Sequence, residues 1–180
     1  MCATEQRLGG KRMNKKFVTA PIVVLLCVAM FVCLAPLTTA QTTDSAQPTV
    51  TRNPAYIDGI TGYHNVSNPF NVRGTEDGTW AAFIGTSTDH AWLIGYMNVG
   101  VYSGSVIAVR VLGGSGTLAV YVGDSSNPSG TWYVAPKYGS SGTTYAVTGP
   151  GWYYFTAPRN FGYISITVIG ELAIDCVQSM

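Results

Sequence analysis

Few side chains in this chain of 180 residues are suited to acid–base or nucleophilic chemistry. The histidines are His64 and His90, and no Gly-x-Ser-x-Gly motif or cysteine–histidine pairing is present. The two histidines are candidate zinc ligands, but a tetrahedral zinc site needs four ligands. The only further sulfur ligand beyond residue 40 is Cys176. Two carboxylates could make a glycosidase, but such a pair usually lines a cleft built from a longer chain. We therefore predict a non-catalytic protein whose histidines are solvated loop residues.

Aromatic side chains are the second chemical resource of the chain. Flat rings stack on the C–H faces of sugars at a low cost in conformational entropy, while amide and guanidinium groups bind the hydroxyls. Trp132 is the leading candidate because the polar segment 124–130 precedes it, whereas Trp92 lies in an apolar run and is expected in the core. The predicted sugar-binding residues are Trp80, Trp132, Tyr133, Tyr138 and Trp152, with Arg73, Asn127 and Arg159 as polar partners.

The first forty residues have the organisation of a secretory signal peptide. Basic residues in 11–16 precede an apolar stretch over 17–37, and small residues ending at Ala40 suit a signal peptidase. The alternative is an uncleaved anchor, for which the uninterrupted segment 22–35 is short compared with a span of about 20 residues. Met13 is an alternative start of the chain. Cleavage after Ala40 predicts a secreted or cell-surface protein with no membrane span in its mature part.

Removing residues 1–40 changes the charge and the cysteine content. The whole chain has a formal net charge of +1, but the part from residue 41 onward is net about −3 and keeps only Cys176. An internal disulfide is therefore excluded, and nucleic acid is an improbable partner because no basic excess exists to neutralise phosphates. The polar segment 41–54 predicts a flexible linker. The triplet that begins at Asn65 is an N-glycosylation sequon, which predicts an exposed loop there.

Short strands must position these side chains. Turn residues recur along 55–180, apolar and polar residues alternate between them, and no window keeps helical spacing for three turns. The run Gly113–Gly116 is expected to join its flanking strands as a hairpin loop. We predict an all-β domain over 55–180 that closes as an antiparallel sandwich or barrel. The nine predicted strands are 79–84, 91–97, 105–112, 117–122, 131–135, 143–147, 152–156, 163–168 and 172–177.

Three segments carry a family resemblance. The first is 71–83, with Asp77-Gly78 followed by an aromatic residue, and the second is 118–132, with a turn at Asp124. The third is 163–177, in which a closing strand contains Ile174-Asp175. Their order and spacing resemble the galactose-binding-like jelly roll of discoidin-type domains and many carbohydrate-binding modules. The resemblance implies a jelly-roll sandwich of about nine strands.

The same resemblance implies a structural calcium ion where the first loop meets the last strand. Calcium takes six to eight oxygen ligands, and Asp58, Asp77 and Asp175 would supply carboxylates, with Glu171 in reserve. In the alternative interpretation Asp77 caps its own turn and Asp175 accepts hydrogen bonds from a neighbouring loop. The sequence leaves both interpretations open.

Two functions are consistent with these features. The leading prediction is a secreted or surface-displayed module that binds carbohydrate or a surface glycan without catalysis. The alternative is a structural or adhesive extracellular protein, such as a filament or sheath subunit that packs against copies of itself. Low charge (11% of residues) and an abundance of Gly (21) and Tyr (11) favour this alternative.

Overall fold

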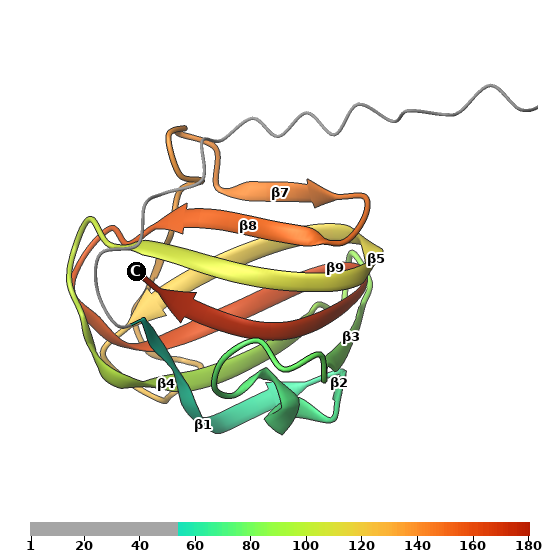
Figure 1. Ribbon diagram of the computed structural model, residues 1–180, viewed down its shortest axis with the longest axis horizontal. Coiled ribbons are helices and arrows are strands. Elements are labelled where there is room, and N and C mark those ends of the chain that lie inside the picture. Colours follow the sequence, from blue (N-terminus) through green and yellow to red (C-terminus); the bar gives the residue numbers. More distant parts are fainter. Residues whose placement is uncertain (1–53) are drawn as a thin grey trace, which may run out of the picture. The chain divides into compact units, whose positions relative to one another are not determined.

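The structure is a computed structural model that describes residues 54–180. The predicted signal peptide and all of the predicted linker except Pro54 lie outside the described residues. The described residues form antiparallel strands with one short 3-10 helix, η1 (Pro69–Val72), which confirms the predicted β-sandwich (Figure 1). No helix among them is long and apolar enough to cross a membrane. The strands are β1 (Ala55–His64), β2 (Val66–Ser67), β3 (Ala81–Gly85), β4 (Ala91–Val101), β5 (Val106–Gly123), β6 (Trp132–Val134), β7 (Thr144–Val147), β8 (Gly151–Thr156) and β9 (Phe161–Ser179).

Two long strands build both layers of the sandwich. β5 and β9 pair along their whole length, from Ile107 opposite Ser179 to Gly123 opposite Tyr163. The β4 layer contains β1, β4, the first half of β9, the second half of β5, and β6 and β7. The β8 layer contains β2, β3, the second half of β9, the first half of β5, and β8. In Figure 1 both long strands turn at one edge and run back in the other layer.

The predicted hairpin loop at Gly113–Gly116 is wrong, because these residues lie inside β5 and bend it. Gly114 has a φ of 98°, and Gly170, close to it on β9, has a φ of 105°. A Cβ atom on Gly170 would lie 2.6 Å from the carbonyl oxygen of Ser115, so the two backbones approach closely at the bend. Glycine therefore turns each strand into the other layer, where it stays paired. The same bend joins two predicted strands, 163–168 and 172–177, into β9.

Sequence patterning does not predict β1. Gly59 and Gly62 interrupt the alternation that marks a strand in the sequence. Both glycines lie beneath aromatic side chains of β4. A methyl group on Gly62 would lie 3.3 Å from Cζ3 of Trp92, and one on Gly59 would overlap the Tyr96 ring. The glycines that obscure this strand are therefore the residues that make room for two aromatic rings.

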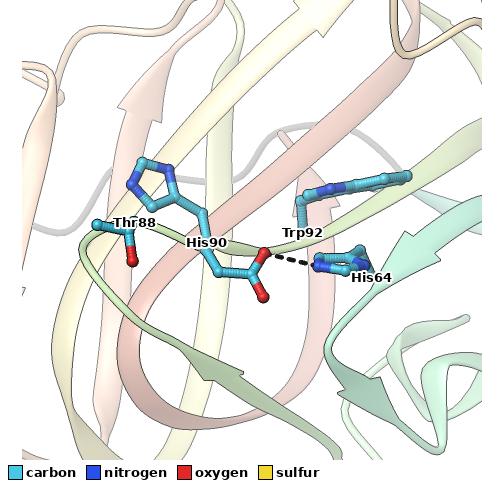
Figure 2. A pocket seen from close by; sticks show the side chains of 5 residues that line it. His64, Thr88, His90 and Trp92 are labelled. Carbon is cyan, nitrogen blue, oxygen red and sulfur yellow. Dashed lines mark hydrogen bonds and ion pairs between the residues drawn. The ribbon is translucent and has the colours of Figure 1, made fainter.

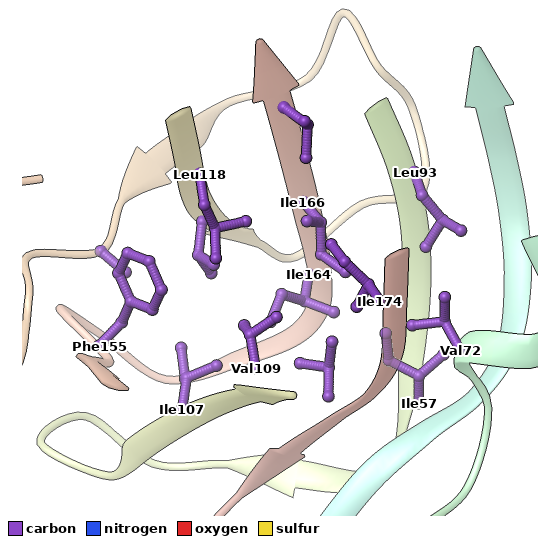
Figure 3. Packing of buried hydrophobic residues seen from close by; sticks show 14 of the residues in the cluster. Ile57, Val72, Leu93, Ile107, Val109, Leu118, Phe155, Ile164, Ile166 and Ile174 are labelled. Carbon is purple, nitrogen blue, oxygen red and sulfur yellow. The ribbon is translucent and has the colours of Figure 1, made fainter. Parts of the chain in front are cut away.

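The hydrophobic core lies between the two layers (Figure 3). Leu93, Ile166 and Val120 form one inward-facing row across β4, β9 and β5, and all three are fully buried. Phe155 of β8 and Ile107 of β5 face them from the other layer. Burial of each such side chain contributes about 1.5–3 kcal/mol, so this core fixes which residues of each strand remain on the outer face.

Candidate functional site

The outer face of the β4 layer carries a row of aromatic side chains. Tyr96 pairs with Tyr163, Tyr163 pairs with Gly123, and Gly123 pairs with Trp132. Directly paired residues of antiparallel strands point to the same face. The three rings therefore lie along one line across β4, β9, β5 and β6.

Two further aromatic residues lie on the same face, in the next rows. In the second row Tyr121 pairs with Ser165, which lies two residues after Tyr163 on β9. In the third row Trp92 pairs with Thr167, two residues further along β9. Between them Ile94 is only 2% exposed although it lies outside the core cluster. We call the following five residues the aromatic face: Trp92, Tyr96, Tyr121, Trp132 and Tyr163.

Rings of the aromatic face lie over glycines of the neighbouring strand. Tyr96 and Trp92 cover glycines of β1, as described above, and Trp132 covers Gly123 of β5. A methyl group on Gly123 would lie 3.1 Å from Cε3 of Trp132. A ring that rests on a glycine leaves its opposite side available to solvent, and 38% of Tyr96 is exposed. This geometry is suited to stacking on a flat apolar surface of a ligand.

Four of the predicted sugar-binding residues form two contacting pairs on opposite sides of β6, because Trp132 is paired with the outward Gly123 and Tyr133 with the inward Val122. The indole Nε1 of Trp132 donates to the carbonyl oxygen of Asn127 at 3.2 Å, which orients the ring. The Arg159 guanidinium lies 4.4 Å from the Tyr133 ring centroid and donates from Nη2 to Oδ2 of Asp124 at 3.0 Å. The guanidinium is thus held by a ring and a carboxylate, and only its Nη donors can bind a hydroxyl, because Nε is buried.

The other predicted sugar-binding residues lie elsewhere. Trp152 is in the β8 layer beneath Arg110, whose guanidinium carbon lies 5.7 Å from the ring centroid, and Tyr138 packs against the same small cluster. Trp80 precedes β3 and is 50% exposed, and Arg73 follows η1 and is exposed. The sequence-based set therefore divides between the two layers, and a binding role for these four residues stays a prediction.

A pocket of about 340 Å³ opens where β4 begins. His64 Nε2 lies 2.8 Å from Oδ1 of Asp89, and Asn65 Nδ2 donates to the other carboxylate oxygen at 2.9 Å. These hydrogen bonds, first that from Asn65 and then that from His64, hold the pKa of Asp89 below its usual value. The His64 ring stacks on Trp92 at 6.1 Å between centroids. The pocket is lined by His64, Thr88, Asp89, His90 and Trp92 (Figure 2).

Sequence spacing alone does not indicate this pocket. Pairing of β1 with β4 places His64 opposite Trp92 and so brings it near His90. The His90 ring points away from His64 (Figure 2). Within residues 54–180 no three His, Cys, Asp or Glu side chains are grouped to hold a metal ion. The predicted core position of Trp92 is wrong, because Ala91 and Leu93 face the core and the indole faces outward.

Two predicted calcium ligands meet on the β8 layer. Asp175 of β9 is buried and accepts N–H bonds from Asp77 at 3.4 Å and Gly78 at 3.3 Å. Burial, together with the charges of Asp77 and Glu76, raises the pKa of Asp175, although the two N–H bonds oppose this rise. The Thr79 hydroxyl and N–H donate to Asp77 at 2.7 and 2.8 Å and lower its pKa. In these contacts Asp77 caps its turn and Asp175 holds the loop, and they leave the calcium site a prediction.

The third predicted ligand, Asp58, is exposed on β1, where the preceding Ile57 accepts an N–H bond from Gly74 at 2.9 Å. Since no group of three acidic side chains is formed among residues 54–180, a calcium ion beside Asp77 and Asp175 would need carbonyl or water oxygens as further ligands. The reserve ligand Glu171 is exposed at the bend of β9.

Cys176 follows Asp175 in a β-bulge opposite Arg110. Its side chain is fully buried, and burial raises the pKa of the thiol to about 12. The thiol is therefore protonated at neutral pH and inaccessible to a partner thiol in the folded domain. Across the bulge Arg110 Nε donates to Oε1 of Glu76 at 2.7 Å, which holds the loop that covers Asp175.

No protein-family model matches this sequence, and no curated protein matches it. Solved structures do match. One is a pectin-binding carbohydrate-binding module, with 12% identity and a TM-score of 0.50 over 68% of this chain and 89% of that chain. Another is a chain of the complex between reduced XRCC1 and the DNA pol beta catalytic domain, with 9% identity and a TM-score of 0.53 over 71% and 98%. At these identities the likeness shows a shared β-sandwich fold.

Proposed function

We propose that this protein is a secreted or cell-surface module that binds carbohydrate without catalysis, through the aromatic face. One observation carries the proposal. Tyr96, Tyr163 and Trp132 lie in register across four strands, and two of the three rings rest on glycines. Asn127, which contacts Trp132, and the side chains of the His64 pocket supply hydroxyl-binding groups at the two ends of the face. The carbohydrate-binding-module neighbour and the galactose-binding-like resemblance support the same interpretation.

The side chains of the His64 pocket are better suited to binding than to catalysis. Within the described residues His64 bonds to Asp89, and no hydrogen bond joins its ring to a serine, threonine or cysteine side chain. An imidazole and a carboxylate without a nucleophile make only part of a hydrolytic triad. The arrangement orients polar groups beside an aromatic ring, as a binding site requires.

The proposed function is tested on a glycan array with the mature protein, followed by titration with the best ligand. Trp132→Ala is expected to weaken binding roughly tenfold or more, since it removes a stacking surface. Tyr102→Ala is the control, because Tyr102 is a 66% exposed aromatic residue outside the aromatic face and outside the predicted sugar-binding set. No retained glycan, or equal losses in both variants, would contradict the proposal.

A second candidate function is assembly of copies of this chain into a filament or sheath. Large apolar side chains away from the aromatic face favour it: Tyr63 is 51%, Phe70 57% and Ile84 55% exposed. Ordered polymers of the mature protein in negative-stain microscopy would support assembly. A monodisperse monomer retained by a glycan favours carbohydrate binding instead.

We also propose a structural calcium ion where the loop 74–79 meets Asp175. A buried carboxylate with two acidic neighbours is stabilised by a cation, and carbonyl oxygens of the loop can complete the ligand set. A chelator is therefore expected to lower the melting temperature of the mature protein, and added calcium should restore it. The Asp175→Asn variant should lose this response. A midpoint that a chelator leaves unchanged in the native protein contradicts the calcium proposal.

A further inference from the structure

The outward positions around the aromatic face carry no charged side chain on β4, β9, β5 or β6. Pairing fixes these positions in three rows, and every member is aromatic, aliphatic, hydroxyl-bearing or glycine. The rows consist of Tyr96, Tyr163, Gly123 and Trp132; of Ile94, Ser165, Tyr121 and Val134; and of Trp92, Thr167 and Ala119.

The cationic side chains of the described residues place no unbalanced positive charge on the aromatic face. Arg159 packs on Tyr133, on the opposite side of β6 from Trp132, and is paired with Asp124 at 3.0 Å, so its charge is balanced. Arg110 is paired with Glu76 in the β8 layer at 2.7 Å, Lys137 lies 5.2 Å from the Tyr145 ring, and Arg73 follows η1, outside the four strands of the aromatic face. Near the opposite end of the face lies the carboxylate of Asp89, hydrogen-bonded to His64. A ligand carboxylate on this surface would therefore meet no unbalanced cation.

We infer that the aromatic face binds an uncharged glycan chain and discriminates against uronate-containing or sulfated chains. A carboxylate placed against tyrosine and tryptophan rings loses hydration and gains no ion pair. The acidic balance of the domain adds repulsion, because residues 54–180 contain seven acidic and four basic side chains. Neutral sugars present C–H faces to the rings and hydroxyls to Tyr, Ser and Thr side chains, so they avoid both costs. This inference rests on the proposed function and names its ligand class.

The test compares two sets of hexasaccharides with the mature protein. One set is neutral and built from glucose, mannose, xylose or galactose, and the other is built from glucuronate or galacturonate. We expect the best neutral ligand to bind roughly tenfold or more tightly than any uronate, with an affinity that added sodium chloride leaves unchanged. A uronate that binds as tightly, with an affinity that falls as salt is added, overturns the inference while the proposed function stands. Binding of neither set overturns both.

A charge-introducing variant makes the test independent of the native ligand's affinity. Thr167→Lys places a cation in the middle of the face, and it is expected to improve uronate binding roughly tenfold relative to neutral binding. Thr148→Lys, in the exposed turn between β7 and β8, adds the same charge and should leave the preference unchanged. Equal responses of the two variants would mean that total charge, and not this face, sets the preference, which also overturns the inference.

Discussion

Gly170→Ala is expected to destabilise the sandwich strongly. Gly170 has a φ of 105°, and a Cβ atom there would lie 2.6 Å from the Ser115 carbonyl oxygen and 2.7 Å from Cα of Gly116. These are backbone atoms, so no side-chain rotation relieves the overlap. The positive φ alone costs an alanine roughly 1–2 kcal/mol, and displacing β5 from β9 breaks the ladder that joins the layers. We expect the free energy of unfolding to fall by more than about 3 kcal/mol.

Urea unfolding followed by circular dichroism measures this change. Gly149→Ala is the matched control, because no atom lies within 4 Å of the added Cβ and its φ is not positive. Its effect should remain within about 0.5 kcal/mol. A Gly170→Ala protein with the stability of this control would show that the bend tolerates a side chain, contrary to the structure.

The bend explains which part of the fold the sequence predicts. Alternation is a local signal, and it correctly marks the inward residues of β4, β5 and β9, such as Leu93, Val120 and Ile166. A glycine run, however, indicates only that the backbone is unusual. Whether Gly114 reverses the chain or redirects it into a second layer depends on the partner strand, here the residues around Gly170. That information lies more than fifty positions away in the sequence.

The residues of the candidate site are also only partly predicted by the sequence. Sequence reasoning selects Trp132, Tyr133, Asn127 and Arg159, because all four lie in or beside polar turns, and the structure joins them in two pairs, Trp132 with Asn127 and Arg159 with Tyr133. It does not select Tyr96, whose place on the aromatic face depends on pairing between distant strands. Trp92 shows most clearly why the sequence misses residues of the aromatic face. Apolar neighbours in the sequence indicate burial, but one-residue alternation places the indole on the opposite face from Ala91 and Leu93.

Gly123→Val is expected to abolish the stacking surface while preserving the fold. The added Cβ would lie 3.1 Å from Cε3 of Trp132 and 3.1 Å from the Thr131 carbonyl oxygen, and the valine methyl groups extend further. The indole must therefore leave its present position and its bond to the Asn127 carbonyl oxygen. Valine itself is favoured in strands, so the backbone of β5 is expected to keep its pairing. Binding should weaken about as much as in Trp132→Ala, roughly tenfold or more.

Gly113→Val is the control for this substitution. Gly113 lies on the same strand, its φ is not positive, and no atom lies within 4 Å of an added Cβ. Titration with the array ligand measures binding, and near-ultraviolet circular dichroism reports whether a tryptophan has changed its environment. If Gly123→Val moves the indole and binding persists while Trp132→Ala loses it, the indole contributes area without needing its flat position over Gly123. If both lose binding and Gly113→Val retains it, the glycine beneath the ring is part of the site, because it holds the ring flat and open to a sugar.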